Sequence, residues 1–194
     1  MDEGTLLLNW KKKPVAILLC NKLNMVFWFK MNKTECLSNS AMRTFFYQER
    51  GMEGLNLDYA YLFQSELACI NLSGASLFDT TLNWSDLQGC NLENATIIDS
   101  CFQGANLQRS SIKSASFSGT SFNFANLSHA DLTGVRLHNC CLTNANLSHA
   151  DLTGVRLYNC WLSNANLTSA KLSGIKYDNT TIWPLEFDMS KIKS

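Results

Sequence analysis

A large apolar residue recurs at every fifth position from Leu57 to Ile182, which gives 26 consecutive pentads without an insertion. A small residue such as Ala60 or Ala105 lies two positions before most of them. This period does not fit an α-helix, because at ~3.6 residues per turn the apolar positions would spread around the whole circumference. It does not fit an uninterrupted strand either, because an odd step sends successive side chains to opposite faces. Each pentad is therefore predicted to contain a short extended piece and a bend, with Gly, Asn, Asp and Ser at the bends.

An internal duplication indicates how many pentads close one coil. Residues 125–144 and 145–164 are identical at 17 of 20 positions, so four pentads are predicted to make one coil. The three differences, at 138/158, 141/161 and 143/163, fall at positions expected to point outward. Phe102, Phe117 and Phe122 are expected to form an aromatic layer in the core. Residues 20 apart form columns, and one inward column of small residues is Thr80, Ser100, Thr120, Cys140, Cys160 and Thr180.

The repeated A-[ND]-L-x-x pattern, as in Ala105-Asn106-Leu107 and Ala125-Asn126-Leu127, resembles that of the pentapeptide repeat proteins. The resemblance extends over residues 55–182 and is closest to small single-domain members of photosynthetic bacteria. It implies an all-β solenoid, a right-handed quadrilateral parallel β-helix with an Ala/Leu interior. No functional residue is carried over from the family.

The ends of such a stack need caps, because they leave backbone groups unpaired and apolar core exposed. A serine N-cap at Ser40 and a cationic end at Arg50 predict a short N-terminal capping helix over 40–50. Trp183 and Phe187 are expected to lie over the last coil. The first 30 residues have no repeat, and one hypothesis is that translation starts at Met31. The expected organisation is an unassigned leader (1–30), an N-terminal capping segment (31–54), the β-helix (55–182) and a C-terminal cap (183–194).

Composition bounds the compartment and the partners. Lys+Arg and Asp+Glu number 16 each, so no charge excess indicates direct binding to nucleic acid or to a membrane surface. The apolar run Val15 to Cys20 is too short to span a bilayer. Eight cysteines without scaffold spacing favour reduced thiols, and hence a cytoplasmic location. Cys140 and Cys160 are interpreted as core thiols, with a redox role as the alternative.

The sequence contains no catalytic motif. It has no glycine-rich phosphate loop, no CxxC and no zinc-ligand spacing, so we expect no enzyme activity and no cofactor. His129 and His149 would stack one coil apart beside Asp131 and Asp151, which could in principle hold a metal. Because copying a coil duplicates a surface His and Asp automatically, no metal site is predicted.

Two outward features are candidate interaction surfaces. Exposed aromatic residues on or beside one side indicate an interface, with packing against the leader as the alternative: Tyr61, Phe63, Trp84, Phe124 and Trp161. Basic residues form a column that suits an acidic partner, with a solvated face as the alternative: Arg136, Arg156 and Lys176. Nearby corners carry Arg109, His129 and His149.

These features together predict a non-catalytic protein–protein interaction scaffold, with an unknown partner, a regulatory role and the option of a homodimer. The family resemblance implies an alternative, since some pentapeptide repeat proteins mimic DNA and bind DNA gyrase or topoisomerase IV. Such mimicry requires a strongly acidic rod. Residues 55–182 contain nine Asp/Glu and six Lys/Arg, a net charge of only −3, so the scaffold is preferred.

Overall fold

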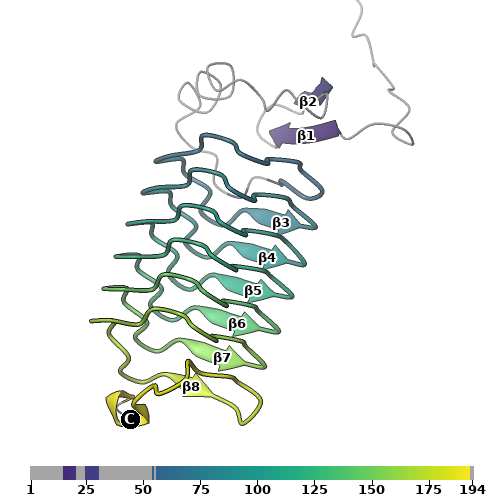
Figure 1. Ribbon diagram of the computed structural model, residues 1–194. Helices are drawn as coiled ribbons and strands as arrows, with labels where there is room; N and C mark the ends of the chain where they lie inside the picture. The colour runs from purple at the N-terminus through teal and green to yellow at the C-terminus, as the bar shows by residue number, and fades with distance from the viewer. Residues whose placement is uncertain (1–14, 21–24, 31–53, 55, 193–194) are drawn as a thin grey trace, which may run out of the picture.

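The computed structural model describes residues 15–20, 25–30, 54 and 56–192 (Figure 1). The capping helix expected over 40–50 lies outside these residues. β1 (Val15–Cys20) and β2 (Met25–Lys30) pair antiparallel, with Val15 opposite Lys30 and Cys20 opposite Met25. The apolar run Val15 to Cys20 is therefore one strand of an antiparallel pair, and the apolar segment Met25–Lys30 is the other.

Residues 56–182 form a parallel β-solenoid, whose coils are stacked along one axis in Figure 1. On one side of the solenoid, consecutive strands from β3 to β8 pair in register at a spacing of 20 residues. The other three sides pair through single parallel bridges, such as Tyr61↔Thr81 and Glu66↔Asp86, and the spacing is 20 residues in all of them except Trp161↔Ile182. Four pentads per coil are thereby confirmed. The strands are β3 (Ser76–Phe78), β4 (Thr96–Ile98), β5 (Ser116–Ser118), β6 (Arg136–His138), β7 (Arg156–Tyr158) and β8 (Lys176–Tyr177).

The predicted bend is present in every pentad of the stack. Each fifth residue from Gly54 to Gly174 has a positive φ, between 49° and 72°. Only eight of these positions are glycine, and the bends also accept Trp84, Arg109 and Phe124. Since left-handed backbone is unfavourable for residues with a Cβ, the inter-coil backbone hydrogen bonds must hold these corners in place.

The core contains two inward columns per side, one of large and one of small residues. Leu72, Leu87 and Leu107 are fully buried, as are the small residues Ala75 and Ala105. The expected aromatic layer is confirmed. The rings of Phe102 and Phe122 stack at 5.2 Å, and Phe117 packs edge-on against Phe122 at 5.0 Å.

The pentad register shifts by one residue at the C-terminal end. Thr181 is buried, whereas Thr180 is exposed, and the Thr181 hydroxyl donates a hydrogen bond to the carbonyl of Leu157. Thr80, near the N-terminal end of the solenoid, makes the equivalent hydrogen bond to the carbonyl of Leu57. Ile182 was expected inside, but it pairs with the outward residue Trp161 and is 47% exposed. Tyr177 was also expected inside; it keeps the register opposite Leu157 but is 43% exposed in the last coil. The prediction of 26 unbroken pentads is therefore wrong at its last step, because the chain inserts one residue as it leaves the stack.

Beyond this shift, the C-terminal segment covers the end of the core. Trp183 and Phe187 are partly buried against the core, and their rings stack at 5.0 Å, as expected for a cap. Ile192 packs there too, after the short 3-10 helix η1 (Met189–Lys191). Asp188 starts η1 by accepting a hydrogen bond from the Ser190 N–H.

Candidate interaction surfaces

The four sides of the solenoid present four faces that differ in chemistry. The strand face consists of β3–β8 together with residues 56–59 and the corner residues that follow each strand. The aromatic face consists of residues 61–64, 81–84, 101–104, 121–124, 141–144 and 161–164. The asparagine face runs from 66–69 to 166–169 and the ionic face from 71–74 to 171–174, each in steps of 20.

The aromatic face carries no charged residue in any of its six coils. The structure places all five predicted aromatic residues on it, with Trp84 53%, Phe124 56% and Trp161 37% exposed. Tyr61 and Phe63 are half-buried and stack on each other at 6.1 Å. A surface without charge that displays large rings matches the composition of the buried centre of protein interfaces.

Trp84 is held on this face by a glycine in the next coil. Gly104 lies one coil after Trp84, and a Cβ built on Gly104 would overlap the Trp84 ring. The Trp84 ring therefore occupies the space that a Cβ at position 104 would fill. Phe124 lies in the same column two coils after Trp84, so the two exposed rings flank Gly104 at one corner of this face.

The strand face carries the predicted basic column. Arg136, Arg156 and Lys176 are aligned in register on β6, β7 and β8, and all three are exposed. None of them forms an ion pair with a carboxylate in the part of the chain that the structure describes. Like charges directly opposite each other on neighbouring strands repel, so this column favours an anionic neighbour.

The asparagine face is a ladder of side-chain amides. Each amide donates to the side chain one coil before, from Asn106 to Asp86 at 3.0 Å and from Asn126 to Asn106 at 3.2 Å. At its corner the rings of His129 and His149 are parallel, with centroids 4.8 Å apart. Within the described residues no group of three or more His, Cys, Asp or Glu side chains could hold a metal ion.

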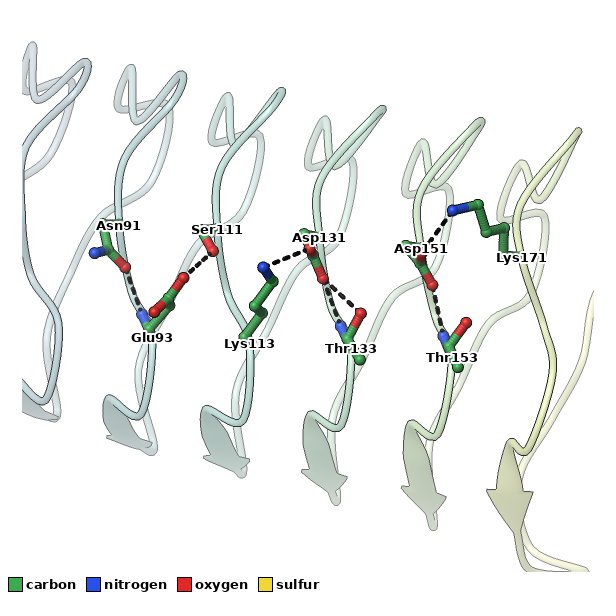
Figure 2. A network of polar contacts seen from close by, with 9 residues as sticks. All are labelled: Asn91, Glu93, Ser111, Lys113, Asp131, Thr133, Asp151, Thr153 and Lys171. Atoms are coloured by element: carbon green, nitrogen blue, oxygen red, sulfur yellow. Dashed lines mark hydrogen bonds and ion pairs between the residues drawn. The ribbon is translucent and has the colours of Figure 1, made fainter.

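Two of the three acids of the ionic face form ion pairs within it, and the third, Glu93, accepts a hydrogen bond from the Ser111 hydroxyl at 2.6 Å (Figure 2). Lys113 Nζ lies 3.1 Å from Asp131, and Lys171 Nζ lies 2.8 Å from Asp151. Burial alone would raise the pKa of Asp151, but hydrogen bonds from Lys171 and Thr153 lower it to about 2. Both aspartates also accept a hydrogen bond from a threonine N–H two residues later at 3.0 Å. These carboxylates are therefore already satisfied within the fold.

A comparison with protein-family models identifies eight copies of the pentapeptide repeat, over residues 56–94, 100–139 and 140–176. These segments make up more than half of the chain. The chain belongs to the pentapeptide repeat family. Members of this family are generally non-enzymatic structural repeat proteins. No curated protein sequence matches the chain.

Solved pentapeptide repeat structures are similar to this chain at low sequence identity. HetL, involved in heterocyst differentiation regulation in Nostoc sp. PCC 7120, is 20% identical over 64% of this chain and 81% of its own, with a TM-score of 0.28. The plasmid-mediated fluoroquinolone resistance protein QnrB1 is 17% identical over 66% and 86%, with a TM-score of 0.37. Rfr23 from Cyanothece 51142 is 28% identical over 69% of both chains, with a TM-score of 0.26.

Three cysteines of this pentapeptide repeat protein, Cys90, Cys140 and Cys160, occupy inward positions of the small-residue columns. Cys140 and Cys160 are fully buried, as predicted for core thiols. The contact with the Cys160 thiol and burial both raise the pKa of Cys140. Burial likewise raises the pKa of Cys90, whereas Cys69 is exposed. The thiols of Cys90 and Cys140 are therefore protonated and shielded, which suits packing.

Sequence reasoning missed two features of these surfaces. The contact between Trp84 and Gly104 could have been found from the 20-residue column that contains both. The acids of the strand face, Asp58, Asp79 and Asp99, were missed because Asp58 occupies a different column from the other two.

No helix of the described segments is long and apolar enough to cross a membrane.

Proposed function

We propose that the chain is a non-catalytic protein–protein interaction scaffold whose aromatic face binds a partner protein. The observation that carries the proposal is the absence of charge from all six coils of that face, together with the exposed rings of Trp84, Phe124 and Trp161. Protein interfaces are depleted of charge at their centres and enriched in aromatic residues, and Trp is the commonest source of large binding contributions.

A direct role in binding nucleic acid or membrane has less support. Both would need Lys or Arg to neutralise phosphate, and the aromatic face has neither. A rigid solenoid instead offers a flat surface whose side chains are already ordered by stacking, which lowers the entropy cost of binding.

The alternative of DNA mimicry is suggested by the similarity to QnrB1, a fluoroquinolone resistance protein. A mimic needs a rod lined with unpaired acids. Here Asp131 and Asp151 are paired with Lys113 and Lys171, and a basic column interrupts the strand face. We therefore place the scaffold ahead of the mimic.

The test is affinity capture from a lysate of the source cell on the immobilised full chain, at low and at moderate salt, with mass spectrometry of the retained proteins. We expect one specific protein that survives moderate salt and is lost with Trp84→Ala and with Phe124→Ala. A matched control is His129→Ala, because His129 is also an exposed aromatic corner residue, with φ 60° like Phe124.

Two outcomes would contradict the proposal. Retention of gyrase or topoisomerase subunits that elute as salt rises, independently of Trp84, would favour the mimic, since exposed charge is screened by salt. A retained protein that binds all three variants equally would place the binding surface elsewhere.

A further inference from the structure

The strand face is divided into two halves of opposite charge. The N-terminal coils carry Asp58, Asp79 and Asp99 on this face and no Lys or Arg. The C-terminal coils carry the basic column Arg136, Arg156 and Lys176. β5 lies between the halves and presents only Ser116 and Ser118 outward. The face is therefore bipolar, with a small and uncharged strand at its centre.

The geometry points to a second copy of this chain as the occupant: the strand faces of two antiparallel rods form a two-fold symmetric dimer centred on β5. The two-fold axis runs parallel to β5 and lies between the two copies. It places the coils of the second copy in the reverse order, while each column of residues faces the same column of the second copy. β5 then faces β5 of the second copy, β4 faces β6, and β3 faces β7. Such an interface uses one patch twice, so the patch must be complementary to itself.

The charges meet this requirement coil by coil. Asp99 and Arg136 both lie one coil from β5, Asp79 and Arg156 lie two coils away, and Asp58 and Lys176 lie three coils away. The axis brings each acid to the same level as the cation of the second copy.

Across the face, acid and cation are offset by two or three positions, about 7–10 Å at ~3.3 Å per residue. This offset is within the ~8–10 Å over which charges interact at moderate salt, and the long Arg and Lys side chains shorten it. Asp178, the one acid of the basic half, faces Asp58, but it already accepts hydrogen bonds from the Asn159 N–H at 3.1 Å and the Thr181 hydroxyl at 2.9 Å.

Apolar groups are paired by the same axis. Phe78 faces Tyr158 of the second copy, and the exposed Ile98 faces His138. Tyr59, which is exposed, packs edge-on against Phe78 at 5.2 Å and widens this patch. Ser116 and Ser118 at the axis allow the two sheets to approach closely.

The size of the face predicts a weak dimer. Seven layers at ~4.8 Å make it about 29 Å tall, and four residues per layer at ~3.3 Å make it about 13 Å wide. The projected area is smaller than the ~800 Å² per partner of a standard interface. We therefore expect a micromolar dissociation constant that depends on salt. Because the dimer uses the strand face, it does not rest on the aromatic face or on its partner.

The experiment is sedimentation velocity of the full chain over a concentration series, at low and at raised salt. We expect a dimer at low salt that weakens at least about tenfold when the charges are screened. Arg136→Glu/Arg156→Glu is expected to be monomeric but as stable as wild type, because one pair of like charges replaces another. The control Arg109→Glu makes the same kind of charge reversal on the asparagine face and should dimerise like wild type.

A mixing experiment keeps the proposal falsifiable. The variant Asp79→Lys/Asp99→Lys is expected to be monomeric alone, and to form a heterodimer when mixed with Arg136→Glu/Arg156→Glu. A long cationic residue is tolerated at such a corner, as Arg109 at φ 58° shows. The inference would be overturned if the wild-type chain stays monomeric or if the mixed variants do not associate. It would also be overturned if the dimer survives Arg136→Glu/Arg156→Glu or is lost with Trp84→Ala.

Discussion

Gly104 is the position at which a single methyl group tests the aromatic face most directly. The glycine has φ +65°, and a Cβ there would overlap the Trp84 ring. Gly104→Ala therefore combines two costs, the strain of a left-handed alanine and the displacement of Trp84 from its contact. Gly154→Ala is the matched control, since Gly154 has φ +69° and nothing within 4 Å of its added Cβ.

The two costs can be estimated separately. A left-handed residue with a Cβ costs ~1–2 kcal/mol, and both variants pay it. Trp84 is 53% exposed, so about half of its surface is buried, and part of that half lies against Gly104. At ~25 cal/mol per Å² and ~100 Å² buried, full release of the ring would cost up to ~2.5 kcal/mol. We expect Gly104→Ala to lower the free energy of unfolding by ~2–4 kcal/mol, and Gly154→Ala by ~1–2 kcal/mol.

The assay is urea unfolding followed by far-UV circular dichroism, in a double-mutant cycle with Trp84→Ala. In the Trp84→Ala background, Gly104→Ala should cost no more than Gly154→Ala, which gives a coupling energy of ~1–2 kcal/mol. Equal costs for the two glycine variants in the wild-type background, or a Gly104→Ala cost that does not depend on Trp84, would refute the contact.

Three further outcomes follow from the hydrogen bonds and the burial. Thr181→Val should lower the free energy of unfolding by ~1–2 kcal/mol because it removes the bond to the Leu157 carbonyl, whereas exposed Thr180→Val should cost less, and equal costs would contradict the register shift. The pKa of Asp151 and of Asp178 is about 2 in the fold, below the ordinary 3.8. The two ionised carboxylates therefore stabilise the fold fully above pH 3.8, and this stabilisation is lost as the pH falls toward 2. The urea midpoint should drop between these pH values, and the drop should be smaller in Asp178→Asn. A midpoint independent of pH there would argue against both shifts. Among the cysteines whose side chains the structure describes, iodoacetamide on the native protein should modify Cys69 first and spare Cys90, Cys140 and Cys160, as peptide mass spectrometry would report.

The solenoid could be predicted from the sequence because every pentad must meet the same geometric condition. An apolar residue at one fixed phase of five forces a bend in each repeat, and a bend is found at every fifth residue from Gly54 to Gly174. The duplication added the coil length, and both inward columns followed from it. The order of Phe102, Phe117 and Phe122 in the core needed nothing more than this register.

The exit from the stack could not be predicted in the same way. Ile182 keeps the five-residue spacing, yet it lies outside, and Thr181 takes the inward place. Asn179, Thr180 and Thr181 are all polar and small enough to occupy either position, so the sequence pattern is the same for both registers. The choice depends on the hydrogen bonds of the Thr181 hydroxyl to Leu157 and Asp178, which no periodicity reveals.

The duplicated coil indicates how such a rod acquires new surfaces without changing its core. Residues 125–144 and 145–164 share every inward residue, because an inward change would disturb the close packing of the coils on both sides. Of the three outward differences, Cys141 to Trp161 adds a ring to the aromatic face, and His138 to Tyr158 replaces an imidazole with a larger phenol ring on the strand face. Both substitutions enlarge a proposed interface. If the two faces bind different surfaces, Trp161→Cys should weaken only capture of the partner, and Tyr158→His should weaken only the dimer. Each coil of the rod can therefore change one binding surface independently of the other.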